Sequence, residues 1–227
     1  MIRHTRVHGV KHHNTTFKDS KLAHQYLDHL TGIEIGAAAH NGFRLPNCQN
    51  VGLRERDRTD FDFYREAQVQ MCGSYAEIDI EGEAHAIPVA DDSQEFVLTS
   101  HVIEHVADPI RVFLEWTRIL KPNGIIFMIF PHRDAHPPDR KRPLSTIGEF
   151  TSAYEEAWTP DTVPEDVHLA AGGRRGHYWV MSLESMLKLI DTCNILYGMD
   201  WQILETHMID DKVSNGHTIV ARYVPQI

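Results

Sequence analysis

Short apolar segments recur along this 227-residue chain, and most of them are separated by a segment of helical or polar character. Residues 125–130 (Ile-Ile-Phe-Met-Ile-Phe) are apolar on both faces, which is typical of a central strand in a parallel sheet. Alternating strands and helices predict a doubly wound, Rossmann-like α/β fold with helices on both faces of a mostly parallel, seven-stranded sheet. The expected strands are residues 32–36, 50–53, 75–80, 95–100, 125–130, 201–207 and 217–223. The last two flank a turn at residues 214–216 and predict a C-terminal antiparallel hairpin.

The clearest helix begins at Asp108-Pro109, because Asp is a favoured N-cap and Pro favours the first helical position. Residues 121–124 (Lys-Pro-Asn-Gly) are expected to end it in a tight turn. Further helices are expected over residues 19–30, 60–70 and 182–192. Residues 131–178 are polar, rich in proline and too long for a simple loop, so we expect an inserted cap with short helices, for example over 146–157. The chain is thus expected to comprise an N-terminal arm and helix (1–30) and one α/β domain (31–227).

Composition excludes several classes of protein. The net charge of −10, from 22 basic and 32 acidic residues, argues against a nucleic-acid partner, because phosphate contacts need clustered Lys and Arg. No apolar run approaches the roughly 20 residues that cross a bilayer, and residues 1–30 lack the pattern of a secretory signal. Cys48, Cys72 and Cys193 are far apart and odd in number, so no disulfide framework is expected. We therefore expect a cytoplasmic protein without a membrane partner.

In a doubly wound sheet, ligands bind beyond the carboxyl ends of the strands. After the first strand, Gly36, Ala37 and Ala38 would let the backbone turn tightly and let a ligand approach it. A packed turn without a ligand is the alternative. The phosphate-binding patterns Gly-x-Gly-x-x-Gly and Gly-Lys-Ser/Thr are absent from the sequence.

Five pieces of sequence at these strand ends resemble the class I S-adenosylmethionine-dependent methyltransferases, in particular the small-molecule group related to the ubiquinone/menaquinone methyltransferases. The pieces are Glu34-x-Gly36, Glu83-Ala84 before Ile87-Pro88, Asp91-x-Ser93-x-Glu95-x-Val97, Ser100-His101-Val102-Ile103-Glu104-His105-Val106 with Asp108-Pro109, and Leu120-Lys121-Pro122-Asn123-Gly124. The resemblance covers roughly residues 32–130, and the C-terminal part by topology only. It implies a methyltransferase domain over residues 31–227, S-adenosylmethionine as cofactor, and methyl transfer to an oxygen or nitrogen of a small-molecule acceptor.

The resemblance also implies which residues bind the cofactor: Glu34, Gly36, Ala37, Ala38, His40, Glu55, Asp57, Glu83, Ala84, Ser100 and His101. Glu83 would face the adenine amino group, and Ala84 would donate a backbone N–H to the ring. Gly52 stands where the family usually has a ribose-binding acid, so Glu55 or Asp57 is expected to take that role. The glycine loop also departs from the family, since Ala38 and His40 stand where glycines are common.

Methyl transfer to a hydroxyl or ammonium group needs a base that takes the proton. His132, just after the fifth strand, is the first candidate, and His101 at the end of the fourth strand is the second. The alternative for each is a histidine that only hydrogen-bonds the backbone near the cofactor. Residues 131–178 are expected to cover the acceptor. Their basic side chains would either meet an anionic acceptor or form a solvated face: Arg140, Arg142, Arg174 and Arg175.

Two patterns suggest a metal. His101-x-x-Glu104-His105 matches a zinc-protease pattern, but a new helix begins at Asp108 and leaves little room for one helix through both histidines. His132-x-Asp134-x-His136 alternates as ligands on an extended segment could. We expect no resident metal, and retain two alternatives to the methyltransferase: a binding or scaffold protein with the same fold, and a metal-dependent hydrolase using His101 and His105. Of the 16 histidines, five are expected to converge at the site: His40, His85, His101, His105 and His132.

Overall fold

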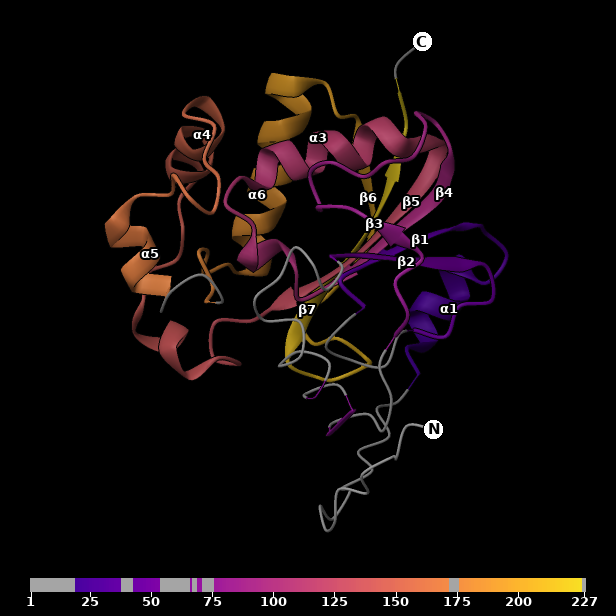
Figure 1. Ribbon diagram of the computed structural model, residues 1–227, viewed down its shortest axis with the longest axis horizontal. Coiled ribbons are helices and arrows are strands. Elements are labelled where there is room, and N and C mark those ends of the chain that lie inside the picture. Colours follow the sequence, from indigo (N-terminus) through magenta and orange to yellow (C-terminus); the bar gives the residue numbers. More distant parts are fainter. Residues whose placement is uncertain are drawn as a thin grey trace, which may run out of the picture.

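The computed structural model describes residues 19–37, 43–53, 66, 69–70, 76–171 and 176–225. One seven-stranded sheet has the order β3-β2-β1-β4-β5-β7-β6 (Figure 1). Its strands are β1 (Gly32–Ile35), β2 (Cys48–Gly52), β3 (Ile80–Glu81), β4 (Gln94–Ser100), β5 (Leu120–Pro131), β6 (Trp201–His207) and β7 (Gly216–Tyr223). The first five strands are parallel, and β7 is antiparallel to both β5 and β6. The expected fold class is therefore confirmed.

Helices cover both faces of the sheet. They are α1 (Lys21–Leu27), η2 (Ile103–His105), α3 (Pro109–Ile119), η3 (Pro137–Lys141), α4 (Ile147–Glu155), α5 (Glu165–Ala171) and α6 (Leu183–Tyr197). Because side chains alternate along a strand, Leu98 and Phe127 pack with α1, whereas Val97 and Ile126 pack with α3 and α6. Figure 1 shows α1 at one end of the sheet and α4 and α5 beyond the other.

The helix α3 begins as its sequence predicts. Asp108 is the N-cap, its side chain accepts the Arg111 N–H at 2.9 Å, and Pro109 takes the first helical position. Ile110, Phe113 and Trp116 are fully buried against the sheet. The segment with His101 and Glu104 lies between β4 and α3, so it is held at the carboxyl end of β4.

Three expected elements differ in detail. The tight turn at residues 121–124 is instead an exposed bulge within β5, because Gln94 pairs with Leu120 and Phe96 already pairs with Ile125. The third strand is shorter than expected. The Asp79 N–H donates to the Asn50 carbonyl at 2.9 Å, but the Asn50 N–H donates to the Asp79 carboxylate at 2.8 Å instead of to a backbone carbonyl, so the ladder begins only at Ile80.

The link between β6 and β7 is longer than the predicted tight turn. The Asp210 carboxylate accepts backbone N–H groups along it, including those of Asn215 and Gly216, each at 2.8 Å. The expected helix at 60–70 and the N-terminal arm fall almost wholly outside the described residues.

Residues 131–178 hold the short helices η3, α4 and α5. That this segment is an insertion covering the acceptor stays a prediction, and it is called the insertion below. Its end is fastened to the segment after β4, because Tyr178 and Trp179 both donate backbone N–H groups to the Glu104 carbonyl, at 2.8 and 3.4 Å. The Trp179 indole N–H also donates to the Val106 carbonyl at 2.6 Å. The helices of the described segments include none with the length and apolar character of a membrane span.

Candidate active site

The turn after β1 places a glycine where no side chain fits. Gly36 has a φ of +73°, and its N–H donates to the Val51 carbonyl at 3.0 Å. A Cβ atom at position 36 would lie 2.5 Å from Cγ2 of Val102. Ala37, the next residue, is buried. The turn therefore joins the carboxyl ends of β1, β2 and β4 through contacts that only glycine permits.

Glu34 lies in β1 beside Leu98 of β4 and is 5% exposed. Its carboxylate accepts the Phe43 N–H at 3.3 Å, which ties the chain at residue 43 back to the base of the turn. Burial raises the pKa of Glu34 to about 7, although the Phe43 N–H and the charge of Lys212 pull it down. Glu34 is thus a buried group that titrates near neutral pH behind the Gly36 turn.

The segment after β3 is anchored to α3. The Ala84 carbonyl accepts the Trp116 indole N–H at 3.2 Å, and the Ile87 N–H donates to the Glu115 carboxylate at 2.6 Å. A cavity of about 170 Å³ opens beside this segment. Its lining comprises Glu83, Ala84, His85, His105, Val106, Ala107, Asp108, Arg111, Val112, Trp158, Thr159 and Pro160. The predicted adenine-binding pair, Glu83 and Ala84, therefore borders a cavity between the sheet and the insertion.

Asn215 brings the two candidate bases to the same place. Its side-chain oxygen lies 3.0 Å from Nε2 of His101, and its carbonyl accepts the His132 N–H at 3.3 Å. His101 has a φ of +55°, a left-handed conformation that is costly for a residue with a side chain and clusters at functional sites. Burial lowers the pKa of His101, but the contacts with Glu104, Asp210 and Asn215 outweigh it, so its pKa is raised overall.

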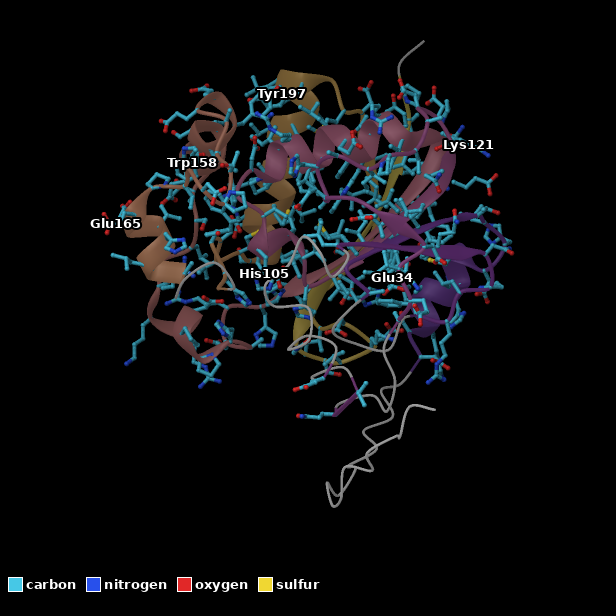
Figure 2. The ribbon with its side chains drawn as sticks, viewed as in Figure 1. Glu34, His105, Lys121, Trp158, Glu165 and Tyr197 are labelled. Atoms are coloured by element: carbon cyan, nitrogen blue, oxygen red, sulfur yellow. The ribbon has the colours of Figure 1, made fainter. Side chains whose placement is uncertain are left out.

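A second group of polar side chains lies between η2 and the insertion. Glu104 is fully buried, and its Oε1 lies 3.4 Å from Nδ1 of His101 and 3.8 Å from Nε2 of His105. His177 contacts Asp139 through Nδ1 at 2.5 Å, and its ring centroid is 4.8 Å from that of His105. Burial raises the pKa of Glu104, but the neighbouring histidines outweigh it and lower the pKa overall. Figure 2 shows His105 between the strands and the insertion helices α4 and α5.

The two metal patterns do not fold as their spacing suggests. His101 and His105 do not share an α-helix, because residues 103–105 form only the short 3-10 helix η2, and α3 starts anew at Pro109. The alternation His132-x-Asp134-x-His136 is broken by a turn in which the Ala135 N–H donates to the His132 carbonyl at 2.9 Å. His136 lies with Asp139 and His177 instead.

The predicted site residues fall into three sets. Glu34, Gly36, Ala37, Ser100 and His101 lie at neighbouring strand ends, Glu83 and Ala84 border the cavity, and Ala38, His40, Glu55 and Asp57 lie outside the described residues. Their roles stay predictions. Arg142 does not face an acceptor, because it donates to Asp139 and to the His177 and Tyr178 carbonyls. Arg174 and Arg175 lie outside the described residues.

Comparison with known proteins points to one family. Residues 20–128 match the methyltransferase domain family. A probable S-adenosylmethionine-dependent methyltransferase of Mycolicibacterium smegmatis is 28% identical over 140 residues, which are 60% of this chain and 53% of that protein. The segment that matches the family model, just under half of the chain, resembles a methyltransferase domain. A probable S-adenosylmethionine-dependent methyltransferase of Mycobacterium tuberculosis is 26% identical over 113 residues, 50% of this chain and 40% of that protein. The chain spans about half the length of the curated relatives it matches.

Solved structures support the fold. A SAM-dependent methyltransferase from Methanosarcina mazei superposes with a TM-score of 0.54 at 16% identity, covering 91% of this chain and 98% of the other. The [4+2]-cyclase SpnF superposes with a TM-score of 0.51 at 12% identity, covering 90% and 79%. At such identities the likeness shows the fold alone, and the cyclase illustrates that this fold is not restricted to one reaction.

The two mycobacterial relatives are named as S-adenosylmethionine-dependent methyltransferases. The described residues leave room for part of a ligand beside Glu83 and Ala84, where the cavity is also lined by His105 and Val106 of the segment after β4. Membership of the ubiquinone/menaquinone group stays a prediction.

Three residues of this region were missed by sequence reasoning. Asn215 was assigned only a hairpin-turn role, and Asp139 and His177 belong to no motif. Their sequence neighbourhoods hold no signal that would have found them. They reach the site only because the β6–β7 link and the end of the insertion fold back onto the segment after β4.

Proposed function

We propose that the protein transfers the methyl group of S-adenosylmethionine to an oxygen or nitrogen atom of a small-molecule acceptor. The observation that carries the proposal is the meeting of the Gly36 turn, the end of β4 and the Asn215-linked histidines at one edge of a methyltransferase-family sheet. When bound, the cofactor supplies a methyl group on a positively charged sulfur. Displacement at that carbon is in line, so the protein has mainly to align the acceptor and manage its proton.

In this proposal the cofactor is held at three strand ends. Gly36 and Ala37 lie under its methionine and ribose, Ser100 and His101 border its sulfur, and Glu83 faces its adenine. The position of Gly36 and Ala37 at the carboxyl end of β1 supports the first assignment, because ligands of doubly wound sheets bind there, and the cavity beside Glu83 supports the last. Ala84, Ala38 and His40, and Glu55 or Asp57 for the ribose, complete the proposed set.

His132 is the proposed general base, with His101 as the second candidate. His132 follows Pro131, the last residue of β5, and its backbone is held by Asn215, which also contacts the His101 ring. Its imidazole is half-buried at this edge, and histidine is the side chain that most often acts as a general base. His101, which is in contact with the Glu104 carboxylate, would hold a proton more readily.

Residues 131–178 are proposed to cover the acceptor. Trp158, Thr159 and Pro160 of this insertion line the cavity that also touches Glu83, which supports that role. The net charge of −10 supports a small-molecule partner over a nucleic acid. A cytoplasmic location belongs to the same proposal.

The first test is calorimetric titration of the full chain with S-adenosylmethionine and with its demethylated product. We expect both to bind, and absence of binding at millimolar cofactor would contradict the proposal. The second test follows formation of the demethylated product in the presence of pooled small-molecule alcohols and amines. Binding without turnover on any pool would favour the scaffold alternative.

A further inference from the structure

Glu104, His105 and His177 form a group of metal-binding side chains that the proposed methyl transfer does not use. Glu104 and His105 belong to η2 after β4, and His177 comes from the end of the insertion. We propose that these three residues bind a divalent transition-metal ion of the zinc class. The site adjoins the His101–Asn215–His132 arrangement, because Glu104 contacts His101, and His105 also lines the cavity beside Glu83.

The three ligand atoms are already close together. One donor atom from each residue lies within 4.8 Å of the others, and Nε2 of His105 is 3.8 Å from Oε1 of Glu104. Bonds of about 2.1 Å to a tetrahedral zinc ion put neighbouring ligand atoms about 3.4 Å apart. Small side-chain movements therefore convert the observed arrangement into a coordination site.

Each histidine is oriented by a hydrogen bond on its far side. Nδ1 of His105 lies 3.0 Å from the Gly176 carbonyl, and Nδ1 of His177 lies 2.5 Å from the Asp139 carboxylate. A carbonyl oxygen can only accept, so Nδ1 of His105 carries the proton and Nε2 presents its lone pair. The Asp139 carboxylate has the same effect on His177. Metal-binding histidines are held in this way, with the second nitrogen donating to a carbonyl or a carboxylate.

Asp139 is in turn fixed in place. It is 2% exposed, and Arg142 donates to its other oxygen at 2.9 Å. Arg142 also donates to the His177 carbonyl at 2.6 Å, so one guanidinium positions both members of the Asp139–His177 pair. The geometry of His177 is therefore set by the protein and does not depend on a ligand.

Glu104 is the observation that points to a cation. Its side chain is fully buried, and neither carboxylate oxygen has a hydrogen-bond partner among the described residues. Oε1 lies 3.4 Å from Nδ1 of His101 and 3.8 Å from Nε2 of His105, and Oε2 makes no hydrogen bond with a described residue. Burying a carboxylate is costly, and a cation bound by Glu104, His105 and His177 would offset that cost more fully than the two histidine contacts do.

The donor set indicates which ion. Two imidazoles and one carboxylate suit zinc and its neighbours in the first transition row, and three protein ligands leave a coordination position open. Calcium and magnesium prefer all-oxygen sites. His136, Asp139 and His177 form a second possible triad, but Nδ1 of His177 is already engaged by Asp139 there, and that triad lacks the unpartnered carboxylate.

The test uses the full chain purified without a histidine tag, stripped by a chelator and then titrated with Zn²⁺ by calorimetry. We expect one ion per chain with a micromolar or tighter dissociation constant. Co²⁺ in place of Zn²⁺ should give visible absorption bands of a low-symmetry site. A wild-type chain that binds no Zn²⁺ up to millimolar concentration overturns the proposal.

Variants then locate the ion. His177→Ala and His105→Ala are each expected to weaken Zn²⁺ binding by roughly 100-fold or more, and Asp139→Asn by roughly 10- to 100-fold. His24→Gln is the matched control, because His24 on α1 also contacts a carboxylate, Asp28, at 2.6 Å. Circular dichroism checks that each variant is folded. Equal Zn²⁺ affinity in wild type, His177→Ala and His105→Ala would refute this ligand set. The cofactor titration is independent, so the methyltransferase proposal is tested separately.

Discussion

Glu34 makes the stability of this fold depend on pH, and Glu34→Gln is expected to remove that dependence. The carboxyl group is 5% exposed in β1, and its pKa is raised from 4.5 to about 7, mainly by burial. Gln has nearly the same shape and keeps an oxygen that can accept the Phe43 N–H. The substitution therefore removes the titration while changing the packing little.

The magnitude follows from the two pKa values. Because the folded-state pKa lies above the unfolded-state value, folding favours the protonated carboxyl. The stabilisation is fully present below pH 4.5 and is lost as the pH rises through about 7. The difference between the two pKa values corresponds to about 3 kcal/mol in total. Most of it falls between pH 5 and pH 8.

The assay is urea unfolding of wild type and Glu34→Gln at half-unit steps from pH 5 to pH 8. Other titrating groups, among them His101 and Glu104, are common to both proteins and cancel in the difference between their free energies of unfolding. That difference should shift against wild type by about 2–3 kcal/mol across the range. A difference that stays constant within about 0.5 kcal/mol would refute the reasoning, because Glu34 would then ionise in its ordinary range.

Three further substitutions test the site and the fold. Gly36→Val is expected to weaken S-adenosylmethionine binding by roughly 100-fold in calorimetry. Gly198→Val is the control, because Gly198 has a similar φ of +63° but nothing within 4 Å of its Cβ position. Equal losses of affinity in the two variants would contradict the placement of the site. His132→Gln is expected to lower kcat by roughly 100-fold while cofactor affinity stays within a few fold of the wild-type value. His207→Gln on β6 is the control and should leave turnover unchanged. An unaltered kcat in His132→Gln would mean that His132 has only a structural role. Asp108→Ala is expected to destabilise the protein by about 1–2 kcal/mol in urea unfolding through loss of the α3 cap, and Asp108→Asn by less, so equal effects would argue against the cap.

The sheet order could be anticipated because its signals are local. Asp108-Pro109 caps α3 wherever the helix packs, and a strand apolar on both faces can only lie inside a sheet. The misjudged details depend on tertiary contacts. The strand β3 is short because Asp79 contacts Asn50 through its side chain, and the β5 bulge depends on how Gln94 and Phe96 pair across it.

Only those site residues that directly follow a parallel strand could be predicted from the sequence. Gly36, Ser100 and His101 follow strands, so the topology rule places them. Asn215 and His177 do not, and their positions depend on how a long link and an insertion fold. The histidines that lie together also differ from those expected. His85 is exposed beside the cavity, whereas His136 and His177 of the insertion lie near His101 and His105.

The insertion contacts Glu104 through the backbone. The buried carboxylate could serve the packing of the insertion or the binding of an ion, and this backbone contact distinguishes the two explanations. Tyr178 and Trp179 donate to the carbonyl of residue 104, a contact that any amino acid at this position would provide. Docking therefore accounts for the burial of residue 104 and gives no reason for its charge. Leucine would fill the same space without the cost of desolvating a carboxylate. The requirement for Glu must come from what its oxygens face, which is His101 and His105, with His177 on the other side. Glu104→Gln is accordingly expected to fold and to dock the insertion as wild type does, but to lose Zn²⁺ affinity. Retained affinity together with disrupted docking would show that the carboxylate serves packing instead.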